Sequence, residues 1–165
     1  MESFVESGMT FGPFDDMDIF RIEKSCLLSK CRNTKTVEFI WKQRKNRMIF
    51  VEAKSSSPVI KGQKREHYEK FIAEITNKFV DSFNLLVAGL MKRRTGWEDI
   101  PTGLTDADYP HMEFKFILIV KNHEETWLEP LRMELEKTMK DHHKIWNSTV
   151  IVMNELIARE KHLVT

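Results

Sequence analysis

Glu38 and the tripeptide Glu52-Ala53-Lys54 are the residues whose types and spacing could support chemistry in this chain. Two carboxylates held close together at neutral pH repel each other unless a cation lies between them or one is protonated. Carboxylate oxygens favour a hard divalent ion, Mg²⁺ or Mn²⁺. Lys54 projects on the same side of an extended strand as Glu52, where it could hydrogen-bond an attacking water or neutralise charge on a phosphoryl group. The pattern therefore predicts a divalent-cation centre with a lysine beside it.

Two strands and a polar loop are expected to position these residues. Residues 37–41 and 48–54 are rich in β-branched and aromatic side chains, and the polar stretch 42–47 separates them. This arrangement is typical of an antiparallel hairpin. Because side chains alternate along a strand, each strand should have two distinct faces. We expect one face to carry Val37, Phe39 and Trp41 on the first strand and Ile49, Val51 and Ala53 on the second. The other face should carry Glu38, Ile40, Lys42, Met48, Phe50, Glu52 and Lys54.

The register of this hairpin decides whether the two carboxylates meet. Pairing of Glu38 with Glu52 requires a loop with an odd number of residues, centred on position 45. A three-residue loop over 44–46 meets this condition, and its last position commonly needs left-handed backbone geometry, which Asn46 tolerates well. The two carboxylates would then lie roughly 5 Å apart at Cβ. A two-residue turn would instead set Glu38 opposite Ala53.

The remaining pattern predicts an α/β fold with a single mixed β-sheet, an antiparallel hairpin and flanking helices. Apolar residues recur at helical spacing from Tyr68 to Leu90, and residues 114–120 are apolar on both faces, as expected of a covered central strand. Further expected elements are a first strand at 18–24, a loop at 91–108, a helix at 124–140 with Leu128, Leu131, Leu135 and Met139 inward, a strand at 149–153, and a last helix capped by Asn154. The strand–helix–strand order implies parallel crossovers.

Glu38 and Glu52-Ala53-Lys54, in this succession of elements, resemble the PD-(D/E)xK nuclease superfamily, a restriction-endonuclease-like fold. The resemblance covers roughly residues 18–120 and predicts one nuclease-like domain over 1–165. It implies Mg²⁺- or Mn²⁺-dependent hydrolysis of phosphodiester bonds in DNA or, less commonly, RNA. Glu38, Glu52 and the backbone carbonyl of Ala53 would bind the metal. Lys54 would orient or activate the water.

The chain departs from the family pattern at three points. Glu38 replaces the usual Asp, and Val37 stands where Pro is common. Only residues 1–17 precede the first expected strand, so we expect the helix that can supply an extra Glu to be absent or very short, with Glu23 or Glu6 as a substitute. Gln63 and Tyr68 lie five residues apart, whereas the Gln-x-x-x-Tyr motif of many exonuclease members needs four, which leaves Gln63 an accessory candidate.

Bulk composition restricts the alternatives. The formal charge of +1 offers no strong overall field for nucleic acid, although basic clusters occur at 42–47, 61–65 and 92–94. No apolar run suits a membrane span or a signal peptide, and Cys26 and Cys31 do not form a disulfide framework, so a reduced, cytoplasmic setting is expected. A zinc site at Asp141-His142-His143 lacks a visible second ligand pair.

Two other interpretations remain open. Glu38, Glu52 and Lys54 could form an ordinary cross-strand ion pair on a solvated face. The chain could also be a non-catalytic protein- or nucleic-acid-binding module on an inactive nuclease-like scaffold, with a homodimer or another protein as partner.

Overall fold

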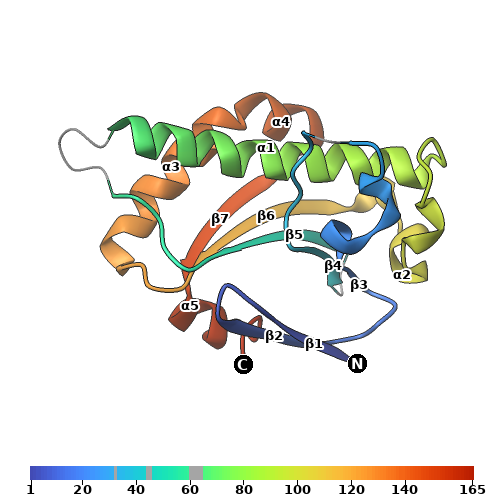
Figure 1. The fold of residues 1–165 in the computed structure, drawn as a ribbon, viewed down its shortest axis with the longest axis horizontal. Coiled ribbons are helices and arrows are strands. Elements are labelled where there is room, and N and C mark those ends of the chain that lie inside the picture. The colour runs from blue at the N-terminus through green and yellow to red at the C-terminus, as the bar shows by residue number, and fades with distance from the viewer. Residues whose placement is uncertain (32, 44–45, 60–64) are drawn as a thin grey trace.

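Helices cover one face of a central five-stranded sheet, and a small hairpin with a short helix covers the other (Figure 1). The computed structural model describes residues 1–31, 33–43, 46–59 and 65–165. The strands are β1 (Glu2–Glu6), β2 (Met9–Phe14), β3 (Ile19–Phe20), β4 (Phe39–Gln43), β5 (Arg47–Lys54), β6 (Glu113–Val120) and β7 (Thr149–Asn154). The helices are α1 (Arg65–Leu90), α2 (Thr102–Thr105), α3 (Leu128–Thr138), α4 (Lys140–Trp146) and α5 (Glu155–Glu160).

The large sheet is mixed, with the strand order β3-β4-β5-β6-β7. β3, β4 and β5 pair antiparallel, whereas β5 with β6 and β6 with β7 pair parallel. Parallel neighbours need a crossover connection, and α1 makes the first crossover while α3 and α4 make the second. The predicted mixed sheet with an antiparallel hairpin and flanking helices is therefore confirmed.

The prediction of a single sheet is wrong, because β1 and β2 form a separate two-stranded sheet. Their turn is Ser7-Gly8, and both residues have positive φ, 49° and 75°. Positive φ at both central positions is characteristic of the tight hairpin turns that match strand twist. A Ser-Gly pair between short alternating segments was the local signal for this hairpin.

Each face of the large sheet contributes to its own apolar core. Phe50, Phe116 and Leu118 face the helices and pack with the apolar stripe of α1. Val51 and Ile119 face the other way and pack under the β1–β2 hairpin and α5. The expectation that residues 114–120 form a strand covered on both sides is confirmed.

The helical predictions hold with changed boundaries. The stripe from Tyr68 to Leu90 forms α1, and the four inward residues predicted for the next helix are buried. That helix ends at Thr138, and α4 follows it. The predicted first strand is short, since only Ile19–Phe20 pairs with β4 and a 3-10 turn follows at Ile22–Lys24. Asn154 caps α5, accepting a hydrogen bond from the Ile157 N–H at 3.0 Å.

Candidate active site

The β4–β5 hairpin has the register expected from its loop. The pairs Phe39–Val51, Trp41–Ile49 and Gln43–Arg47 are all centred on position 45. Asn46 adopts φ 56°, the left-handed geometry that a three-residue loop favours at its last position. Arg44 and Lys45 lie outside the described residues.

At this end of the hairpin, the last regular pair of β4 and β5 is Phe39–Val51. Glu38 is the residue that precedes β4 and lies outside that pairing. The Glu38 N–H donates to the carbonyl of Val51 at 3.1 Å. Val37 breaks the predicted alternation: it packs in the core on the α1 side, whereas Phe39 packs on the hairpin side. Its N–H donates to Ser82 Oγ of α1 at 2.9 Å, because the chain leaves the strand here and turns toward the helix.

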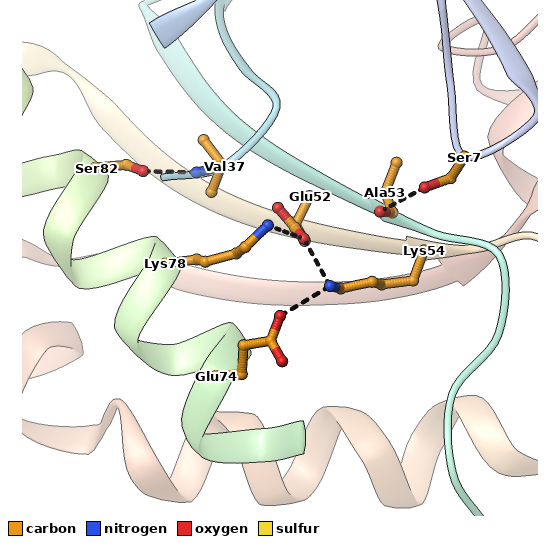
Figure 2. Close-up of polar contacts among 8 residues, drawn as sticks. All are labelled: Ser7, Val37, Glu52, Ala53, Lys54, Glu74, Lys78 and Ser82. Carbon is orange, nitrogen blue, oxygen red and sulfur yellow. Dashed lines mark hydrogen bonds and ion pairs between the residues drawn. The ribbon is translucent and has the colours of Figure 1, made fainter. Parts of the chain in front are cut away.

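Glu52 is a fully buried carboxylate held by two lysines (Figure 2). Lys78 Nζ of α1 lies 2.6 Å from Glu52 Oε1, and Lys54 Nζ lies 3.4 Å from the same oxygen. Burial raises the pKa of Glu52, although Lys78 and Lys54 oppose this effect. The solvated cross-strand ion pair that the sequence left open is therefore wrong for Glu52, which is 0% exposed.

Lys54 is held from its other side by α1, through Glu74. Its ammonium lies 2.9 Å from Glu74 Oε1. Burial disfavours the charge on Lys54, but the hydrogen bond to Glu74 and the charge of Glu52 outweigh it and raise the pKa of this lysine. Lys54 is thus a cation at neutral pH, suited to donating hydrogen bonds and stabilising negative charge rather than to accepting a proton.

Three carboxylates from separate segments form what we call the acidic cluster: Glu6, Glu23 and Glu38. One carboxylate oxygen of each lies within 4.8 Å of the others. Glu6 ends β1, at the tip of the hairpin, and Glu23 lies in the 3-10 turn after β3. Burial, the charge of Glu52 and interactions with Glu23 together raise the pKa of Glu38 to about 8. The hairpin tip thus contributes one carboxylate, Glu6, to the acidic cluster.

Arg21 partly compensates the acidic cluster. Its guanidinium hydrogen-bonds Glu6, lies 3.3 Å from Glu23, and stacks 3.8 Å from the centroid of the Phe4 ring. The Arg21 side chain is only 10% exposed. A planar guanidinium suits such a position because it can stack on a ring and pair with carboxylates at once.

The carbonyl of Ala53 points toward the hairpin tip and accepts a hydrogen bond from Ser7 Oγ at 2.9 Å. Lys121 Nζ also binds the tip, at the carbonyl of Gly8, at 2.7 Å. A carbonyl oxygen has two lone pairs, so the bond to Ser7 leaves one acceptor position on Ala53. The hairpin tip is therefore attached to the sheet beside Ala53, and it brings Glu6 near Glu38.

The donor set fits a hard divalent cation. Glu6, Glu23, Glu38 and Glu52 are the four candidate carboxylate ligands, and Glu74 is a further carboxylate that binds Lys54. With Arg21, Lys54 and Lys78 as the three cations, two negative charges remain in excess when all these groups are ionised. Glu52 Oε2 is buried and has no hydrogen-bond partner among the residues that the structure describes. A buried carboxylate oxygen without a partner is costly, and a cation with oxygen ligands would satisfy it.

The sequence interpretation missed Glu74 and Lys78, which lie four residues apart on one face of α1. One signal was available for Lys78. It lies seven residues from both Phe71 and Leu85, two apolar residues that pack toward the core, so its charge interrupts an inward-facing row. Gln63 lies outside the described residues.

The other chemical candidates have structural partners. His142 and His143 both direct Nδ1 at Ser148 Oγ, at 2.9 and 2.7 Å, and neither belongs to a group of three metal-ligand side chains in the described part of the chain. In the basic segment 92–94, Arg94 donates to the carbonyls of Leu27 and Ser29, so it is not available to phosphate.

Within the described residues, no helix is both long enough and apolar enough to cross a membrane. Comparisons with models of protein families, with curated proteins and with solved structures found no match to this chain. A function is therefore inferred from the residues of this chain alone.

Proposed function

We propose that this protein is a metal-dependent nuclease of the PD-(D/E)xK type that hydrolyses phosphodiester bonds in DNA or, less commonly, RNA. The observation that carries the proposal is that Glu38, just ahead of β4, lies close enough to Glu52 for their charges to interact, while Lys54 pairs with Glu52 at 3.4 Å. The order of elements adds support, because the β4–β5 hairpin is followed by α1, which packs on the sheet, and then by β6, the succession that the resemblance implies.

Glu38, Glu52 and the Ala53 carbonyl would hold Mg²⁺ or Mn²⁺, with Glu23 and Glu6 as accessory ligands from the acidic cluster. The bound ion would supply Lewis-acid stabilisation of the phosphate and a lowered pKa for the attacking water. Lys54, a cation anchored by Glu74, would donate to the attacking water or to a non-bridging phosphate oxygen and stabilise the negative charge that develops. Because the Glu52 carboxylate is buried, water screens its interactions with the bound ion and with Lys54 less strongly.

The test is incubation of plasmid and single-stranded DNA and of RNA with Mg²⁺ or Mn²⁺, comparing the wild type with Lys54→Ala. We expect Lys54→Ala to lower the cleavage rate by about 10²–10³-fold, the usual cost of removing one charge-stabilising donor. Lys70→Ala is the matched control, because Lys70 is 72% exposed and pairs with Glu66, 77% exposed, on the surface of α1.

Equal cleavage by the wild type and Lys54→Ala would assign the activity to a contaminant or to another site. Cleavage by neither would favour a second candidate function, a non-catalytic binding module on this scaffold. A specific observation favours that alternative: Glu52, Lys54 and Arg21 are all engaged in ion pairs within the protein. Nucleic-acid binding without turnover, measured in EDTA, would then identify it.

A further inference from the structure

The two lysines at Glu52 contact only one of its oxygens. Lys78 Nζ and Lys54 Nζ lie 2.6 and 3.4 Å from Oε1 (Figure 2). Oε2 is buried and has no hydrogen-bond partner among the described residues. One oxygen of this carboxylate is therefore an anchor, while the other has unused acceptor capacity.

Lys78 is the closer and more buried of the two anchors. Its contact is shorter by 0.8 Å, and its side chain is 14% exposed, against 26% for Lys54. Lys54 is also shared with Glu74 at 2.9 Å, whereas Lys78 approaches from α1, a helix packed on the sheet through its apolar stripe. Glu74 and Lys78, four residues apart on this helix, thus hold the two functional side chains of β5 separately.

We propose that Lys78 is a positioning residue that fixes Glu52 through Oε1 and so presents Oε2 as the metal-ligand atom. A compact ammonium suits this role because it contacts one oxygen as a point charge. Glu74 has the corresponding role for Lys54 and does not act on the metal ligands. This inference rests on the proposed metal centre. It predicts that Lys78 controls the affinity for the metal ion and that Glu74 controls the cleavage rate.

The test is Mn²⁺ binding to the full chain without nucleic acid, measured by calorimetry or by the EPR signal of unbound Mn²⁺. Lys78→Met should weaken Mn²⁺ binding by about 10–100-fold, the usual effect of removing a partner of a metal ligand. Glu74→Gln should leave Mn²⁺ affinity unchanged and lower the cleavage rate at saturating Mn²⁺. Lys70→Met, on the exposed face of the same helix, is the matched control and should bind Mn²⁺ as the wild type does.

Lys78→Arg covers the case in which Lys78→Met does not fold, because it retains the charge beside buried Glu52. The guanidinium fork tends to pair with both oxygens of a carboxylate, so we expect a folded protein whose Mn²⁺ affinity is still reduced. Wild-type affinity in Lys78→Arg or in folded Lys78→Met would overturn this inference alone. Failure of the wild type to bind Mn²⁺ would instead overturn the metal centre itself, and Mn²⁺ binding without cleavage would overturn only the hydrolytic function.

Discussion

Glu38→Gln should make the metal-free protein more stable at neutral pH. Burial and the neighbouring carboxylates Glu52 and Glu23 raise the pKa of Glu38 from 4.5 to about 8. In the unfolded chain this carboxyl ionises near its ordinary value, so folding at pH 7 requires it to take up a proton. The substituted amide needs no proton, has nearly the same shape, and can donate a hydrogen bond to Glu23.

The sign and size follow from linkage between proton binding and folding. Because the folded pKa of Glu38 is raised, its stabilising contribution is complete below pH 4.5 and is lost as the pH rises toward about 8. Between pH 4.5 and pH 7 the pH rises by roughly 2.5 units, and at 1.36 kcal/mol per unit the protein loses about 3 kcal/mol of folding stability. Partial solvent exposure of Glu38 screens its interactions, so we halve this to about 1.5 kcal/mol. For a chain of this size the expected gain is about 3–6 °C in Tm.

Thermal unfolding of the wild type and Glu38→Gln in EDTA, from pH 4.5 to 8.5, measures this effect. The two Tm curves should nearly coincide at pH 4.5 and separate as the pH rises, with Glu38→Gln the more stable. Saturating Mn²⁺ should then raise the Tm of the wild type and not that of the variant, because the variant lacks one proposed ligand. Parallel curves across this range, or a less stable variant at pH 7, would refute the electrostatic account of the site.

Three further outcomes are expected. Ser7→Ala removes the hydrogen bond to the Ala53 carbonyl and should cost about 0.5–1.5 kcal/mol in chemical denaturation, and an unchanged midpoint would show that the hairpin tip is held without it. Phe83→Ala, at a residue 1% exposed and packed on Phe114, should cost about 3–5 kcal/mol, which a loss below 1 kcal/mol would contradict. Burial and the charge of His143 lower the pKa of His142 to about 4, so its contribution to stability is complete above pH 6.5 and is lost as the pH falls toward 4. His142→Leu should flatten the acid side of the Tm–pH curve, and an unchanged slope would contradict this.

Local features of the chain determined the β4–β5 hairpin. The odd loop length and the left-handed tolerance of Asn46 set a register centred on position 45, and side-chain alternation placed Glu52 and Lys54 on the α1 face. The stripe of α1 was equally readable. These features depend on residues a few positions apart, which is the range over which backbone geometry and periodicity act.

Tertiary packing decided which charges meet. Glu6 reaches Glu38 because the β1–β2 hairpin packs on the sheet, and Lys78 reaches Glu52 because the apolar stripe of α1 packs on the same face. The turn of the chain at Val37 was set by contact with α1 rather than by strand alternation. Distances between segments far apart in sequence are set by how cores pack, and periodicity does not encode them. The sequence alone thus determined Glu38, Glu52 and Lys54 as candidates, and only the tertiary structure decided the burial of Glu52 and the residues that hold it.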